Sequence, residues 1–196
     1  MYNLALDSDA PKSARQRRVS PEENMKRRII YILMLLFLAC RAAYALSDED
    51  FKRWQFIDDF VFNGIPLSLD TSDADIRALG RVIKIETEEY EALHDKGLML
   101  EMRTYHLDGL EVVAHFAKGV NSKGQLSKAV VTKAKWKINK GLRIGSPIDL
   151  VINTLGEPTT KSEGTYSYCG ETSIDCAIFE FSKNKVTKIT FTYYLD

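Results

Sequence analysis

Two cysteines near the C-terminus are the residues whose type and spacing most directly suggest chemistry. Cys169 and Cys176 flank the segment GETSID, and the residues just outside them, Tyr168 and Ala177, fall opposite each other in a predicted hairpin. A disulfide between the two would close a small loop and contribute about 2–3 kcal/mol. Redox-active pairs are usually closer, as in Cys-x-x-Cys, and the segment lacks the further ligands of a zinc site. The spacing therefore predicts a structural disulfide.

The three histidines form no recognisable catalytic or metal-binding pattern. His94 lies in the turn-like segment LHDKG, and the predicted register places His106 and His115 on opposite faces of a sheet, where they cannot share a metal. No nucleophile–base pair, glycine-rich phosphate loop, HExxH motif or pair of catalytic carboxylates stands out. The sequence predicts a protein that is not an enzyme and that uses no metal and no cofactor.

A basic stripe is the first candidate for partner binding. Lys133, Lys135 and Lys137 alternate with apolar residues in a segment that we predict to be a strand. Such a stripe is either a solvated strand face, paired with Glu86 and Glu88, or a contact for an acidic partner. We take Lys133 and Lys135 as candidate partner-binding residues.

Outward-facing aromatic and basic side chains are the second candidate. A three-residue loop at 107–109 pairs Thr104 with Val112, which turns Arg103 and Tyr105 away from the core. Tyrosine and arginine are frequent anchors at protein interfaces.

The last predicted hairpin adds two more candidates. A three-residue loop at 183–185 pairs Phe179 with Ile189, which places Ile178 and Tyr194 on the outward face. The predicted partner-binding set is therefore Arg103, Tyr105, Lys133, Lys135, Ile178 and Tyr194.

A capped helix is predicted in the segment GLRIGSPIDLVINTLGEPTT, residues 141–160. Ser146 suits the N-cap, Asp149 can complete a capping box, and Gly156 ends the helix. Its apolar face is formed by Ile148, Val151, Ile152 and Leu155.

A weaker copy of this helix lies at residues 64–80. Asp70 or Thr71 would cap it, Ile76 and Leu79 would form its apolar face, and Gly80 would end it. An N-terminal helix precedes it, in which Phe51, Trp54 and Ile57 recur at helical spacing. We assign this aromatic cluster to the core rather than to a ligand cage.

Each of the two copies is followed by segments with strand-like alternation. They are residues 81–90, 97–106, 109–118 and 126–138 after the first helix, and 163–169, 175–182 and 185–195 after the second. The pattern predicts an α+β fold made of two helix-plus-antiparallel-meander repeats, with the helices packed on one face of the sheet. The predicted parts are an extension and signal peptide (1–45), a helix (46–63), a first repeat (64–138) and a second repeat (139–196).

The N-terminal segment indicates export. Three basic residues at 26–28 precede an apolar run at 29–40, and Ala43-Tyr44-Ala45 is a small-x-small cleavage site before Leu46. The run is shorter than the roughly 20 residues that span a bilayer, although an uncleaved membrane anchor is an alternative. Cleavage would remove Cys40 and leave an even cysteine pair, as expected in an oxidising compartment. In a second alternative, Cys40 is a lipid-attachment site.

Composition fits a globular protein without a nucleic-acid partner. The 196 residues are 45% hydrophobic and 28% charged, and the formal net charge is zero. Residues 1–45 carry eight basic and four acidic side chains out of totals of 27 and 27, so the rest of the chain is mildly acidic.

The motif GLRIGSPIDLVINTLGEP followed by an aromatic-rich meander resembles small envelope proteins of the SmpA/OmlA type and the repeat unit of the β-lactamase inhibitory protein family. The resemblance is specific over residues 141–194 and loose over 64–136. It implies two helix-plus-meander units joined in one curved sheet, with a disulfide near the first strands of a repeat. The motif residues are structural, so they imply a fold and not a target.

These observations predict a periplasmic or secreted, non-enzymatic module that binds another protein. One concrete form is an inhibitor or immunity protein against an envelope or secreted hydrolase. The alternative is a structural component of outer-membrane assembly in the SmpA/OmlA manner. Contact with a membrane is expected only through the signal peptide or a lipidated Cys40.

The first testable prediction concerns the mature N-terminus. We expect mass spectrometry of the exported protein to find Leu46 as its first residue, because the small side chains of Ala43 and Ala45 suit signal peptidase. A mature chain that begins at a lipid-modified Cys40, or one that keeps the apolar run, would contradict this prediction.

Overall fold

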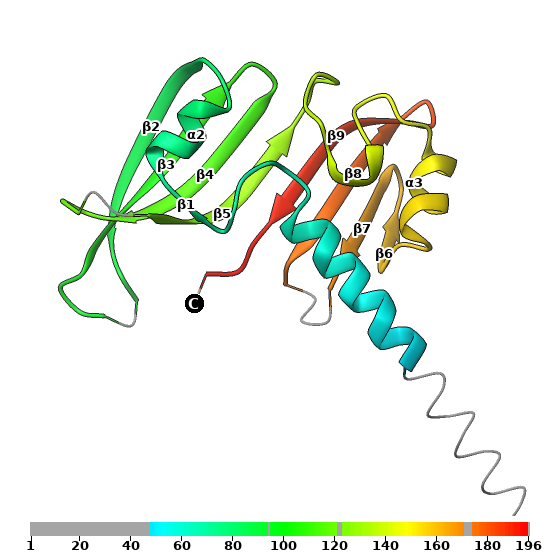
Figure 1. The fold of residues 1–196 in the computed structure, drawn as a ribbon, viewed down its shortest axis with the longest axis horizontal. Helices are drawn as coiled ribbons and strands as arrows, with labels where there is room; N and C mark the ends of the chain where they lie inside the picture. Colours follow the sequence, from blue (N-terminus) through cyan, green and yellow to red (C-terminus); the bar gives the residue numbers. More distant parts are fainter. Residues whose placement is uncertain (1–47, 94, 121–122, 171–173, 196) are drawn as a thin grey trace, which may run out of the picture. The chain divides into compact units, whose positions relative to one another are not determined.

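The structure is a computed structural model that describes residues 48–93, 95–120, 123–170 and 174–195, and an antiparallel sheet of nine strands is its main element (Figure 1). The strands are β1 (Asp70–Thr71), β2 (Val82–Glu91), β3 (Met99–Leu107), β4 (Leu110–Ala117), β5 (Gly124–Val131), β6 (Thr160–Ser162), β7 (Thr165–Cys169), β8 (Cys176–Ser182) and β9 (Lys185–Thr192). Their order across the sheet is β2-β3-β4-β5-β9-β8-β7-β6, and β1 pairs with the start of β5.

Within these ranges, fewer residues lie in helices than in strands. An N-terminal helix covers residues 48–62, α2 covers Asp73–Ala78 and α3 covers Ile148–Leu155, with a single 3-10 turn at Asn139–Gly141. The predicted α+β class with an antiparallel sheet is therefore confirmed.

Aromatic packing fixes the N-terminal helix to the second half of the sheet. The ring centroid of Phe60 lies 6.2 Å from that of Phe179 on β8 and 6.0 Å from that of Phe191 on β9. Gly64 follows the helix, and a Cβ atom there would lie 2.2 Å from the ring of Phe191. Only glycine allows this close approach, so the chain can leave the helix directly over the aromatic core.

The first turns of the N-terminal helix are less buried than the sequence predicts. Phe51 and Trp54 are 44% and 40% exposed, whereas Ile57 is buried. The buried stripe of this helix begins at Ile57 and continues through Phe60 and Val61, which are both buried. The assignment of Phe51 and Trp54 to the core is wrong.

The β3–β4 hairpin has a different register from the predicted one, and this corrects the position of Tyr105. A two-residue turn at 108–109 closes the hairpin, so Tyr105, not Thr104, pairs with Val112. A shift of one residue turns every side chain to the other face. Tyr105 is therefore fully buried, and its hydroxyl donates a hydrogen bond to Asp73 Oδ1 at 2.9 Å.

The β8–β9 hairpin has the predicted pairing but a shorter loop. Phe179 pairs with Ile189 as expected. The turn at 183–184 has two residues, both with positive φ (50° and 60°), which is typical of a type I′ hairpin turn. A bulge between Glu180 and Phe181 supplies the one-residue shift that a three-residue loop was expected to supply.

The basic stripe is not on a strand. β5 ends at Val131, and Lys133 and Lys135 lie in the turns that follow it. Both ammonium groups pair with the carboxylate of Asp108 in the β3–β4 turn, Lys135 at 2.9 Å, and not with Glu86 or Glu88 as predicted. The indole N–H of Trp136 donates to the Asp108 carbonyl oxygen at 2.9 Å. The segment that follows β5 is therefore bonded to the β3–β4 turn.

The helix caps also differ from the expected ones. Helix α3 starts after Pro147, and the hydroxyl of Ser146 instead accepts a hydrogen bond from the Arg143 N–H at 3.1 Å. Helix α2 is capped by Ser72, whose hydroxyl accepts from the Asp75 N–H at 3.1 Å in a capping box.

The predictions about export concern other parts of the chain. The apolar run at 29–40, Cys40 and the cleavage site at 43–45 lie outside the described residues, as does His94. Within the described ranges, no helix has the length and apolar character needed to cross a membrane.

The predicted disulfide is present, with the Cα atoms of Cys169 and Cys176 4.2 Å apart. We expect the double variant Cys169→Ser/Cys176→Ser to lose about 2–3 kcal/mol of unfolding free energy in urea, because the unfolded chain regains the freedom of the closed loop. Reduction of the wild-type protein should give the same loss. A change below about 0.5 kcal/mol in both experiments would contradict a structural role.

Candidate functional site

The face of the sheet that points away from the hydrophobic core, here called the outer face, carries charged, polar and aliphatic side chains together with Tyr90. Strand registers place on it Lys84, Glu86, Glu88, Tyr90, Leu100, Met102, Thr104, His106, Glu111, Val113, His115, Gln125, Lys128, Val130, Ile178, Glu180, Lys188, Thr190 and Thr192. The core side chains alternate with these residues along the same strands.

The six predicted partner-binding residues lie in three separate places. Ile178 is on the outer face of β8, and Tyr194, just after β9, is 56% exposed. Lys133 and Lys135 are ion-paired in a turn, and Tyr105 is in the core. The structure does not bring the six together.

Arg103 lies on the core side of β3 rather than on the outer face. Its guanidinium carbon is 4.6 Å from the centroid of the Phe116 ring, and its Nη2 atom is 2.5 Å from a carboxylate oxygen of Glu101. Burial by itself would lower the pKa of Arg103. Hydrogen bonds with Glu101 and Tyr105, together with the charge of Glu101, outweigh this effect and raise the pKa. Arg103 is therefore engaged within the fold, and its predicted outward position is wrong.

A cavity of about 590 Å³ lies at one end of the outer face. It is bounded by the β2–β3 hairpin, by β4 and β5, and by the residues after β9. Its lining is mostly aromatic and aliphatic, with three further polar residues: Tyr90, Ala92, Leu93, Leu98, Leu100, Tyr194 and Leu195, together with Asp95, His115 and Gln125. Leu93 is 87% exposed, so this rim presents apolar surface to solvent.

A chain of hydrogen bonds, here called the floor, begins at Tyr90 and His115, two residues that line this cavity. The Tyr90 hydroxyl lies 2.6 Å from His115 Nδ1, His115 Nε2 lies 2.9 Å from Ser127 Oγ, and Ser127 Oγ lies 3.3 Å from the Val113 carbonyl oxygen. Because that carbonyl can only accept, Ser127 donates to it and accepts from His115 Nε2–H. Nδ1 then accepts from the Tyr90 hydroxyl. This tautomer holds the ring in place and leaves no basic nitrogen facing Ser127.

Ser127 reaches the histidine because of a bulge. The register of β4 and β5 shifts where Val113 pairs with Lys128 and Ala114 pairs with Leu126, so Ser127 is the extra residue. Bulges commonly redirect a side chain in this way. The bulge is thus the local feature that completes the hydrogen-bonded chain.

Burial controls the ionisation of these groups. It lowers the pKa of His115, because an imidazolium would lose hydration, and it raises the pKa of Tyr90 for the corresponding reason. Both effects favour a neutral floor for the cavity at neutral pH.

Ionisable side chains lie close together elsewhere on the outer face. His106 lies between two carboxylates, with Nε2 3.6 Å from Glu86 and Nδ1 3.7 Å from Glu111, and Lys128 Nζ is 3.3 Å from Glu111. On β8 and β9, Lys188 Nζ is 2.8 Å from Glu180.

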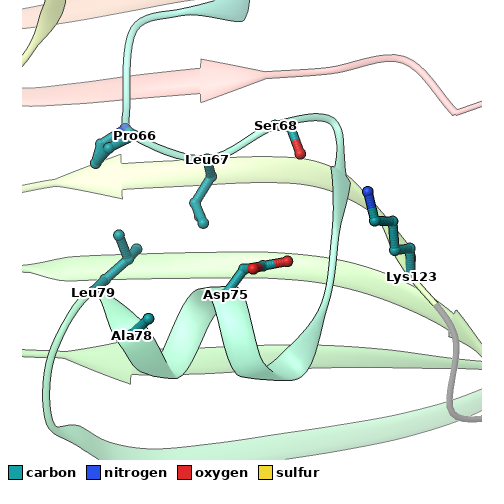
Figure 2. Close-up of a pocket in the computed structure, with 7 residues that line it drawn as sticks. All are labelled: Pro66, Leu67, Ser68, Asp75, Ala78, Leu79 and Lys123. Carbon is teal, nitrogen blue, oxygen red and sulfur yellow. The ribbon is translucent and has the colours of Figure 1, made fainter.

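A second hollow, of about 410 Å³, lies beside α2 (Figure 2). Its polar residues are Ser68, Asp75 and Lys123, and its apolar wall comes from Leu67 and Leu79 among others. The carboxylate of Asp75 accepts from the N–H and hydroxyl of Ser72, and these bonds lower the pKa of Asp75. This acid is therefore used to cap α2, and we do not assign a site here.

Sequence reasoning identified Tyr194 but missed the other residues of the cavity. It placed His106 and His115 on opposite faces, whereas both lie on the outer face. Tyr90 stood at the end of a predicted strand, and the pairing that brings it to His115 depends on the β3–β4 register.

The arrangement can bind apolar and aromatic groups, but it does not gather metal ligands. Within the described residues, no group of three or more His, Cys, Asp or Glu side chains could hold a metal ion. Comparison of the chain with protein-family models, curated proteins and solved structures finds no match.

The histidine of the cavity gives a pH-dependent prediction. We expect His115 to titrate below the ordinary histidine pKa of about 6.5. Because the unfolded chain binds this proton more readily, His115 costs no stability above about pH 6.5 and lowers the unfolding free energy as pH falls through the depressed pKa of the folded state. NMR titration of the ring and urea unfolding at pH 7.5 and 5.5 measure both effects.

The matched control is His115→Gln, which cannot take up a proton and should lose less stability between these two pH values. A titration midpoint of His115 at or above 6.5 would contradict the assignment of a half-buried, neutral ring.

Proposed function

We propose that this chain is an exported, non-enzymatic module that binds another protein through the outer face of its sheet. The observation that carries the proposal is the cavity of about 590 Å³, in which Leu93 and Tyr194 remain 87% and 56% exposed. Exposed apolar surface with polar surroundings marks interaction sites. Tyrosine is enriched among the residues that dominate binding energy.

The order of elements supports a tandem architecture. Helix α2 is followed by β2 to β5 and helix α3 by β6 to β9, and the last strands of the two series, β5 and β9, pair with each other. We infer that these are two copies of one helix-plus-meander unit, with their helices on the core side of a common sheet. Such an arrangement would leave the outer face for a partner.

The disulfide supports export. Structural disulfides persist in oxidising compartments, and Cys169–Cys176 is compatible with one. A sheet held by a disulfide and a hydrogen-bonded floor is also preorganised, so little conformational entropy would be lost on binding. An inhibitor or immunity protein against an envelope or secreted hydrolase is the concrete form that we favour.

The test uses affinity capture with the full chain. We expect crosslinked complexes purified from an envelope extract of the native host to contain one reproducible protein. The variants Leu93→Ser and Tyr194→Ala should reduce its recovery at least about tenfold, since interface anchors typically contribute more than 1.4 kcal/mol.

Leu150→Ser is the matched control, because Leu150 is 44% exposed on α3, outside the cavity. Equal recovery with all three variants would exclude the cavity as the binding site. Recovery of no protein by the wild-type chain would contradict the proposed function.

A further inference from the structure

Strand β2 forms one edge of the sheet and pairs, among the described strands, only with β3. It is ten residues long, and the residues from 86 to 91 are all exposed. A long edge presents unpaired N–H and C=O groups that can pair with another strand. The only irregularity is a bulge between Val82 and Lys84, at its start.

The hydrogen-bond pattern shows which groups are unpaired. The Ala92 N–H donates to the Leu98 carbonyl at 2.9 Å, so Ala92 and Leu98 form a hydrogen-bonded pair. In an antiparallel hairpin every second pair is of this kind, and in those pairs the backbone groups of β2 point toward β3. The alternate residues direct their backbone groups away from β3. They are Ile85, Thr87, Glu89 and Glu91.

Charge determines what could pair with this edge. The strand carries Glu86, Glu88, Glu89 and Glu91 against a single lysine, Lys84. A second copy in antiparallel pairing about the middle of β2 would place glutamates opposite or diagonal to one another, which is unfavourable. Within the described part of the chain Glu86 and Glu89 form ion pairs but Glu88 does not, so the charge of Glu88 remains available to a basic partner.

The apolar neighbour of Glu88 adds a second requirement. Tyr90 lies two residues further along the same face of β2 and lines the cavity. A side chain on an added strand opposite Tyr90 would therefore extend the apolar surface of the cavity rim. The side chain two positions away would lie opposite Glu88.

We infer that the β2 edge accepts an extended, basic segment of a partner protein as an added strand. A lysine or arginine of that segment pairs with Glu88 and an apolar side chain packs beside Tyr90. Backbone hydrogen bonds supply affinity and the alternating side chains supply specificity, as in other strand-addition complexes. This inference rests on the proposed function in taking the partner to be a protein, but it concerns the edge and not the cavity interior.

A designed peptide tests the inference. We expect a fluorescein-labelled peptide of sequence TKVFVKVT, in which lysine and phenylalanine lie two positions apart on one face, to bind the full chain in fluorescence anisotropy. The acidic counterpart TEVFVEVT should bind at least tenfold more weakly. Hydrogen exchange measured by NMR should slow at the backbone amides of Thr87 and Glu89 when TKVFVKVT is present.

Two pairs of variants separate backbone pairing from charge. Thr87→Pro removes an N–H that the sheet itself does not use, and we expect it to weaken binding at least tenfold. Thr87→Val keeps the N–H and should bind within about twofold of the wild type. Glu88→Lys should reverse the preference between the two peptides, whereas Glu88→Gln should only reduce it.

Absence of TKVFVKVT binding, equal binding of both peptides, or unchanged exchange at Thr87 and Glu89 would overturn the inference. The exchange measurement uses the wild-type chain, so it decides the matter even if Thr87→Pro does not fold. The peptide experiment uses no native partner. Failure of the peptide to bind would therefore overturn the inference about the β2 edge without bearing on the affinity capture that depends on Leu93 and Tyr194.

Discussion

Pairing of β5 with β9 is the interaction on which the rest of the described structure depends. Four residue pairs, from Lys128–Thr192 to Val131–Ile189, join the strands from β2 to β5 with those from β6 to β9. Because side chains alternate, burial of Ala129 against Phe191 on the core side fixes which residues point outward on both strands. The cavity is a product of this junction, since Gln125 before the paired stretch of β5 and Tyr194 after β9 both line it.

The sequence predicts those parts of the fold in which only one pairing satisfies the hydrophobic pattern. On either side of residues 183–184, the apolar residues match only when Phe179 meets Ile189, and the structure has that pair. The β3 segment is different, because Leu100 and Met102 occupy one set of alternate positions and Tyr105 and Leu107 occupy the other. Periodicity cannot choose between two such sets, and the length of the turn at 108–109 decides.

The candidate site could be predicted less well because it depends on contacts between distant segments. The Tyr90–His115 hydrogen bond needs two consecutive registers to be correct, and Ser127 reaches His115 only through a bulge that nothing in the local sequence marks. Lys133 and Lys135 were misplaced for a related reason. Lys133 and Lys135 continue the alternation of polar and apolar residues seen along β5, so the sequence predicts a longer strand. In the structure both side chains lie in turns, where their ammonium groups pair with Asp108.

Site-specific photo-crosslinking tests the central claim, that the outer face is the surface offered to a partner. A benzoylphenylalanine residue at Gln125, which lines the cavity and is exposed, would be compared in the exporting host with one at Glu163, an exposed turn residue between β6 and β7. We expect a discrete crosslinked protein from position 125 and none from position 163. A partner crosslinked from position 163 but not from 125 would contradict it.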